Sequence, residues 1–157
     1  MNRSMNPRLV LALAILFPGA GHVAAGQALR GLCFALFAIL FIWQMPHFFA
    51  LAWMYRADYR AGGFRMITDD DPAGVRTSRH MMAYGVLLLV VSLIPAEVGL
   101  VGAGYAVIAA VLGAAFLAFI LLLAAAPSEA RAVRVFLGSI AYLPLLLLVM
   151  VADKLLA

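Results

Sequence analysis

Residues 43–59 read WQMPHFFALAWMYRADY, and the change of character within this stretch decides how the chain is organised. The part that ends at Met54 is almost entirely apolar, whereas the remainder carries phenol, carboxylate and guanidinium groups. An apolar helix of this kind lies in lipid and delivers Tyr55, Arg56 and Asp58 together to a membrane surface. Such a surface can hold an anionic head group while an apolar tail stays in the lipid.

The composition of the whole chain places it in a membrane. Hydrophobic residues make up 67% and charged residues 11% of the 157 residues, whereas about a quarter of the residues in soluble domains are charged. The single Cys33 excludes a disulfide framework and a cysteine-based metal site. The net charge is +4, but the basic residues flank apolar runs, which argues against nucleic acid as a partner. We therefore predict an all-α integral membrane protein whose main partner is the lipid bilayer.

About five hydrophobic helices are predicted, because a membrane span takes about 20 apolar residues. They cover residues 9–25, 31–54, 81–98, 102–125 and 133–152. The first segment is short and is interrupted by the sequence PGAG at residues 18–21. It can cross the bilayer as a short helix, or form a re-entrant hairpin that is buried against protein. We therefore treat residues 1–30 as an N-terminal hydrophobic hairpin or short helix, separate from residues 31–157 with their polar loop at 55–80.

The basic residues predict an orientation in the membrane. Nine of the 11 lie at the N-terminus, in the 55–80 loop, or in and beside the 127–132 loop, whereas Arg30 and Lys154 lie on the other side. The excess of basic residues in cytoplasmic loops predicts that the 55–80 loop is cytoplasmic and the C-terminus outside, in an inner membrane of the bacterial type. The N-terminus is cytoplasmic if the first segment spans and outside if that segment is re-entrant.

The 55–80 loop holds the residues best suited to chemistry. On a helix that continues past the membrane, Tyr55, Asp58 and Tyr59 share one face, and Arg56 and Arg60 share the neighbouring face. A carboxylate can bind Mg²⁺ together with substrate phosphates, and a guanidinium can pair with phosphate oxygens. The alternative is an ordinary cytoplasmic loop in which arginines fix the topology and aspartates offset their charge.

Two further features have both a structural and a functional reading. The sequence Asp69-Asp70-Asp71-Pro72 could form a second metal site, but aspartate and proline together favour a turn. His47 lies eight residues before Tyr55, about 12 Å along a helix and at membrane depth. An ionisable side chain there is a functional candidate. The structural alternative is a neutral histidine that is hydrogen-bonded to a neighbouring helix.

The same stretch resembles the heme O synthase (protoheme IX farnesyltransferase) family of UbiA-type intramembrane prenyltransferases. The similar segments are WQMPHF at 43–48, Tyr55-Arg56-x-Asp58-Tyr59, GGFRM at 62–66, SLIP at 92–95 and AYLPL at 141–145. The resemblance covers about residues 34–157 and concerns only the C-terminal half of that family. Residues 31–157 are accordingly interpreted as the C-terminal part of a UbiA-type domain.

The resemblance implies a fold, a reaction and a set of site residues. Enzymes of this family have nine transmembrane helices around a central cavity, and two Asp-bearing cytoplasmic loops bind a Mg²⁺-diphosphate group. They join the farnesyl group of farnesyl diphosphate to a vinyl group of heme b, with addition of water, and so give heme O. By resemblance, Asp58 contacts the Mg²⁺-diphosphate. The implied residues are Asp58, Tyr55 and Tyr59 for catalysis and Arg56, Arg60, His47 and Trp43 for substrate binding.

One departure from the family limits this prediction. Nothing in residues 1–33 resembles the first Asp-rich loop, so we expect the chain to be inactive as an isolated monomer unless a second chain or copy supplies that half. The alternative is a catalytically inactive remnant or a non-enzymatic membrane interaction or assembly protein. Half of a small transporter is disfavoured, because the last three spans offer almost no polar path.

Overall fold

The computed structural model describes residues 28–156, and every regular element in that range is a helix. The helices are α3 (Ala28–Met54), α4 (Arg56–Ala61), α5 (Val75–Glu97), α6 (Ala103–Ala125) and α7 (Glu129–Leu156). Four of them, α3, α5, α6 and α7, are long and apolar enough to cross a membrane. The predicted all-α membrane architecture is thus confirmed. The predicted helix at 9–25, and with it almost all of the 1–30 segment, lies outside the described residues.

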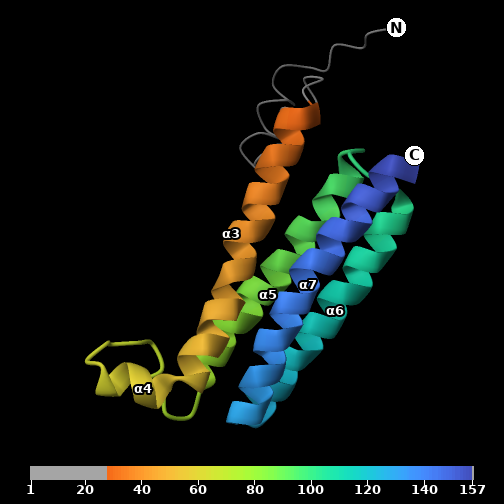
Figure 1. Ribbon diagram of the computed structural model, residues 1–157. Coiled ribbons are helices and arrows are strands. Elements are labelled where there is room, and N and C mark those ends of the chain that lie inside the picture. The colour runs from red at the N-terminus through yellow and green to blue at the C-terminus, as the bar shows by residue number, and fades with distance from the viewer. Residues whose placement is uncertain (1–27, 157) are drawn as a thin grey trace, which may run out of the picture.

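The four long helices lie side by side, and α4 turns away from them at one end (Figure 1). Helix α5 packs against α3 and α6, and α7 packs against the same two helices. Each long helix therefore has two neighbours, and the four close a ring. In the view of Figure 1, the first half of α3 diverges from the other three helices.

The interior of the ring is apolar, and so is much of its outer surface. Ile39, Leu88 and Ile120 are fully buried, whereas Val107 and Leu148 are exposed on the outside. Helices that are hydrophobic all round are expected when the surrounding solvent is lipid. Three of the buried hydroxyl groups in this interior are paired with one another or with the backbone. The Ser92 hydroxyl lies 2.8 Å from that of Tyr142, and the Tyr105 hydroxyl donates to the Ser92 carbonyl at 2.8 Å.

Helix α3 begins three residues earlier than predicted. Helices α5 and α7 begin six and four residues earlier, and in each of these two a polar side chain explains the difference. Helix α5 begins at Val75 instead of residue 81, because the Asp71 carboxylate accepts the N–H of Thr77 in its first turn at 2.7 Å. Helix α7 begins at Glu129 instead of residue 133, where the Ser128 hydroxyl accepts the N–H of Arg131 at 3.3 Å. A prediction based only on the length of the apolar runs leaves out the first turns of α5 and α7, because these turns contain charged residues.

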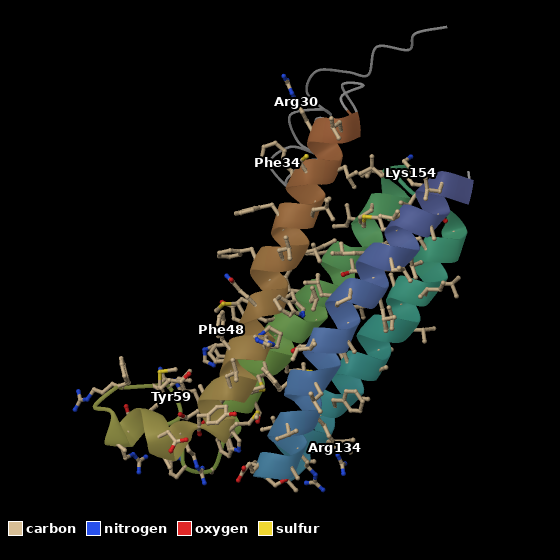
Figure 2. All side chains as sticks on the ribbon, viewed as in Figure 1. Arg30, Phe34, Phe48, Tyr59, Arg134 and Lys154 are labelled. Atoms are coloured by element: carbon tan, nitrogen blue, oxygen red, sulfur yellow. The ribbon has the colours of Figure 1, made fainter. Side chains whose placement is uncertain are left out.

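The described basic residues gather at one end of the bundle. This end, called the α4 end below, holds the end of α3, the start of α5, the end of α6 and the start of α7. Figure 2 shows Tyr59 and Arg134 at the α4 end and Arg30 and Lys154 at the opposite end. Within residues 28–156 the α4 end carries seven arginines, and the opposite end carries Arg30 and Lys154. The seven are Arg56, Arg60, Arg65, Arg76, Arg79, Arg131 and Arg134.

Candidate functional site at the α4 end

The chain changes direction at Tyr55 but keeps its helical register. Tyr55 has φ −104° and ψ 22° and separates α3 from α4. Its N–H still donates to the Leu51 carbonyl at 3.0 Å, and the Tyr59 N–H donates to the Tyr55 carbonyl at 2.9 Å. The predicted continuous helix is therefore wrong in direction, since α4 leaves the bundle (Figure 1). The predicted i, i+3, i+4 spacing of Tyr55, Asp58 and Tyr59 is preserved.

A glycine ends α4 and fixes the position of Tyr59. Gly63 has a positive φ of 77°. The Phe64 N–H donates to the Tyr59 carbonyl at 2.9 Å, and the Gly63 N–H donates to the Arg60 carbonyl at 3.1 Å. These two bonds form a Schellman motif, whose usual apolar contact is here the edge-on packing of Phe64 against Tyr59, with ring centres 6.3 Å apart.

The segment between α4 and α5 folds back onto the end of α3. The buried Thr68 hydroxyl donates to the Ala52 carbonyl at 3.3 Å. Gly74 has φ 71°, and a Cβ atom at this position would lie 2.6 Å from the buried Trp53 ring. The predicted 55–80 loop is therefore α4, a compact connection and the first turns of α5. Because the connection is tied to α3, α4 is held at a defined place.

Asp69 stabilises this connection. Its carboxylate accepts the N–H of Met66 at 2.7 Å and lies 3.3 Å from Nε of Arg60. The hydrogen bond from Met66 and the guanidinium of Arg60 together lower the pKa of Asp69 below its usual value. The aspartate run thus forms a turn, as the favoured reading predicted. No group of three or more histidine, cysteine, aspartate or glutamate residues within 28–156 could hold a metal ion, so the second metal site is not found.

Asp71 stabilises the start of α5. It is 6% exposed, and its carboxylate accepts the Thr77 N–H at 2.7 Å. Burial raises the pKa of Asp71, but the backbone N–H groups of Thr77, Arg76 and Val75 favour the ionised form and make the net shift downward. A carboxylate at this end of a helix also interacts favourably with the helix dipole.

Both arginines proposed as phosphate ligands contact their own chain. The Arg56 guanidinium lies 4.9 Å from the centre of the Trp53 ring, within the range of a cation–π contact. Arg60 pairs with Asp69 while its side chain remains 66% exposed. An exposed ion pair contributes about 0–1 kcal/mol, so an anion with several charges can displace it.

Asp58 is the carboxylate of α4, and it is exposed. Within the part of the chain that the structure describes, its side chain makes no hydrogen bond or ion pair. Asp70 is exposed in the same way, but it lies in the turn and away from Tyr55 and Tyr59 in sequence. A single carboxylate fits one contact to a Mg²⁺ ion that arrives with a diphosphate, and does not form a site for the free ion.

His47 and Trp43 belong to a second cluster, inside the bundle. His47 Nδ1 lies 2.8 Å from the Ser139 hydroxyl on α7, and Trp43 Nε1 donates to the Ser139 carbonyl at 2.7 Å. The His47 ring stacks on Trp43 and on Phe136, with ring centres 4.9 and 4.8 Å apart. The hydrogen bond to a neighbouring helix that the structural reading of His47 predicted is therefore present. Sequence reasoning missed Ser139, although it is a polar residue in an apolar run.

The two clusters lie at different depths on α3. Eight residues separate His47 from Tyr55, which corresponds to about 12 Å along the helix axis. The structure thus brings Tyr55, Asp58 and Tyr59 together at the α4 end, and Trp43 and His47 together below them. A ligand that touches both clusters has to enter the membrane.

An apolar cavity of about 560 Å³ lies between the first half of α3 and the last turns of α7. Leu32, Leu36 and Leu40 line it from α3, and Leu147 and Met150 line it from α7. It lies at the end of the bundle opposite to α4, and its apolar lining suits hydrocarbon. It is therefore separate from the charged groups around Asp58.

The fold and the α4 end define an integral membrane protein with a charged site at one boundary of its helices. The chain belongs to the UbiA prenyltransferase family, whose match covers residues 1–148. The match therefore includes the first 30 residues, which the resemblance seen in the sequence left out.

The curated relatives specify the branch of the family to which the chain is similar. It is 41% identical over 137 residues to the protoheme IX farnesyltransferase of Solibacter usitatus, with 87% of this chain and 47% of the relative covered. It is 40% identical over 146 residues to the enzyme of that name from Opitutus terrae, with 92% and 50% covered. The chain thus spans about half the length of the curated relatives it matches. No solved structure matches it.

Proposed function

We propose that this chain forms half of a protoheme IX farnesyltransferase site, in which farnesyl diphosphate and heme b meet and heme O is made. The proposal is supported by the names of the relatives and by the two clusters on α3 and α4. The α4 end suits a diphosphate, and the cluster around His47 suits a flat aromatic acceptor inside the membrane. The pathway served is heme biosynthesis.

The observation that carries the proposal is the Asp58 carboxylate, which is unpaired among residues 28–156. Two other aspartates of this segment are used by the fold, Asp69 in the turn and Asp71 at the start of α5. Asp58 stands on α4 between Tyr55 and Tyr59 and makes no such bond within the described residues. A carboxylate at the membrane boundary that makes no hydrogen bond or ion pair with the described residues is available to bind a ligand.

Each residue of α4 has a separate role in this proposal. Asp58 would hold the Mg²⁺ that accompanies the diphosphate, and the bound ion would offset the negative charge of the diphosphate oxygens. The Tyr55 and Tyr59 hydroxyls donate hydrogen bonds to the oxygens of the departing diphosphate. Arg56 and Arg60 exchange their contacts with Trp53 and Asp69 for the phosphate oxygens, which stabilises the charge that develops as the carbon–oxygen bond breaks.

The second half of the site comes from elsewhere in this proposal. Mg²⁺ in phosphate sites is held by one or two carboxylates together with substrate oxygens and water, and α4 supplies one. The relatives are about twice as long as the matched region. A second chain or copy that brings another carboxylate would complete the site, and the 157-residue chain alone would not turn over.

The orientation in the membrane follows from the distribution of arginines. Seven basic residues at the α4 end against two at the other end, within residues 28–156, favour a cytoplasmic α4 end and an outer C-terminus. In a Cys33→Ser background, a cysteine at Ala61 should react with an impermeant maleimide only in inverted vesicles. A cysteine at Gly104 should react only in right-side-out vesicles, and the reverse pattern would overturn the orientation.

The binding of farnesyl diphosphate tests the proposed site. Purified chain in nanodiscs should bind it in a Mg²⁺-dependent manner, and Asp58→Asn should weaken binding about tenfold or more, since a charged contact is worth about 1.5–3 kcal/mol. Asp70→Asn is the matched control and should bind as the wild type does. Equal binding by Asp58→Asn would refute the role of Asp58. No binding by the wild type would favour the inactive remnant or assembly protein.

A further inference from the structure

Ser139 is the point at which three contacts of the α3–α7 interface meet. Its side chain is fully buried, and its Oγ donates to the Phe136 carbonyl at 2.6 Å. The same Oγ lies 2.8 Å from Nδ1 of His47, and its own carbonyl accepts the Trp43 N–H at 2.7 Å. One serine therefore holds the side chains of both Trp43 and His47.

The geometry determines which atom carries the proton between Ser139 and His47. A serine hydroxyl has one proton, and a carbonyl oxygen can only accept. At 2.6 Å from the Phe136 carbonyl, the hydroxyl proton has to point at that oxygen, because two unshielded oxygen lone pairs would otherwise face each other. Oγ is then left as an acceptor, and His47 Nδ1 is the donor.

His47 is consequently a neutral imidazole with its proton on Nδ1. The doubly protonated form would place a positive charge among apolar side chains inside the membrane, which is costly. The remaining nitrogen, Nε2, keeps its lone pair. The stacking of the ring on Trp43 and Phe136, with interplanar angles of 24° and 29°, fixes the direction of that lone pair.

Nε2 has no hydrogen-bond partner among residues 28–156. Nε2 is also not fully buried. In the described part of the chain, Thr77 Oγ1 is the only fully buried side-chain nitrogen or oxygen atom without a hydrogen-bond partner, so Nε2, which has no partner either, must keep some accessible surface. An unprotonated imidazole nitrogen that is fixed in direction and is not fully buried, at membrane depth, is arranged to bind an electron-pair acceptor. Histidines that bind metals usually donate their other N–H to a fixed acceptor, and Ser139 supplies that acceptor.

We propose that Ser139 is a positioning residue, which fixes the Nδ1–H tautomer of His47 so that Nε2 can bind the iron of a metalloporphyrin. The choice of ligand rests on the proposed function, in which heme b is a substrate. The tautomer itself does not depend on it. An axial bond from Nε2 would place the porphyrin against α3 and α7 and limit its motion while one edge reacts.

Nitrogen NMR of the imidazole tests the tautomer in the absence of any ligand. A chain with His22→Gln and His80→Gln leaves His47 as the only histidine. In nanodiscs, its Nδ1 should show the shift of a protonated nitrogen and its Nε2 that of an unprotonated one. Ser139→Ala should shift the population toward Nε2–H. Ser92→Ala, a buried serine that bonds to Tyr142, is the matched control and should leave the pattern unchanged. An Nε2–H wild type, or no change in Ser139→Ala, would overturn the proposal.

Titration with hemin tests the ligand. The wild type should give the absorption spectrum of an imidazole-ligated heme, His47→Ala should lose that signature, and Ser139→Ala should weaken binding about tenfold or more. Ser92→Ala should bind as the wild type does. If both His47→Ala and Ser139→Ala kept the spectrum of an imidazole-ligated heme, the ligand assignment would be refuted. Failure of farnesyl diphosphate to bind at Asp58 would instead refute the proposed function and leave the tautomer and ligation intact.

Discussion

The Arg60 guanidinium lies 3.3 Å from the Asp69 carboxylate, and this contact joins α4 to the turn that follows it. The same carboxylate accepts the Met66 N–H at 2.7 Å. The two contacts of Asp69 differ in how much they stabilise the turn, because the arginine side chain is exposed whereas the hydrogen bond from the backbone closes the turn. Asp69 is therefore first a residue of the turn and second a partner of Arg60.

Substitution of either partner should separate these two roles. Asp69→Ala removes the acceptor of the Met66 N–H and should speed amide hydrogen exchange at residues 66–69 by tenfold or more, equivalent to about 1.4 kcal/mol. Arg60→Ala removes only an exposed ion pair and should change exchange there less than about threefold. Mass spectrometry of the chain in nanodiscs would measure both. Equal effects of the two substitutions would mean that the ion pair, not the backbone bond, holds the turn.

Asp71 should make stability depend on pH in the acidic range. Because its pKa is lowered in the folded state, its contribution is fully present above the usual aspartate pKa of 3.8 and is lost as the pH falls through the lower native value. Asp71→Asn should reduce the free energy of unfolding by about 1 kcal/mol at neutral pH. The difference from the wild type should shrink below pH 3.8.

Denaturant unfolding in mild detergent micelles would measure this, with Asp70→Asn as the control. Asp70 is exposed, and its substitution should change stability by less than about 0.5 kcal/mol. A gap between Asp71→Asn and the wild type that stays constant on acidification would contradict the cap at the start of α5.

Gly63 should be the sensitive member of the Gly62-Gly63 pair. Gly63→Ala places a side chain at φ 77°, which costs about 1–2 kcal/mol. It should therefore loosen the Phe64 N–H and the packing of Phe64 on Tyr59. Gly62 has φ −78°, and a Cβ there meets the Phe64 ring at 3.3 Å, so Gly62→Ala should have a smaller effect. Exchange of the Phe64 amide compares the two, and faster exchange in Gly62→Ala would be the contrary result.

Close packing of α5 against α6 should depend on Gly113. A Cβ there would lie 3.3 Å from Leu89 Cβ and still closer to a Leu89 methyl group. Gly113→Ala should therefore destabilise the bundle by about 1–3 kcal/mol. Gly104 has more space, with the nearest atom 3.7 Å from a Cβ, so Gly104→Ala should be neutral or slightly stabilising. Unfolding in detergent would rank the two, and an equal loss would show that the close approach at Gly113 is not required.

The spans could be predicted from sequence because lipid imposes a simple rule. A helix in hydrocarbon needs a long apolar run, and α3 and α6 begin and end close to such runs. The spacing of Tyr55, Asp58 and Tyr59 was also predictable, since helical register survives a bend as long as the backbone bonds continue. The change of direction at Tyr55 leaves no comparable pattern in the residues.

The contacts that organise the site could not be predicted, because they join residues distant in sequence or depend on the backbone. Ser139 meets His47 across 92 residues, and only the packing of α7 on α3 brings them together. Arg60 was assigned to phosphate by residue type, whereas the turn places Asp69 beside it. Asp71 extended α5 by six residues, because one carboxylate can stabilise a charged first turn that apolar counting excludes.

Formation of heme O in membranes tests the central claim, that this chain is one half of a farnesyl transfer site dependent on Asp58. Membranes with the 157-residue chain, farnesyl diphosphate, heme b and Mg²⁺ would be compared with membranes that also contain the first half of a relative. Chromatography and mass spectrometry should find heme O only in the second case. The product should disappear with Asp58→Asn and persist with Asp70→Asn. Heme O made equally well with Asp58→Asn, or never made with the complementing half present, would contradict the account.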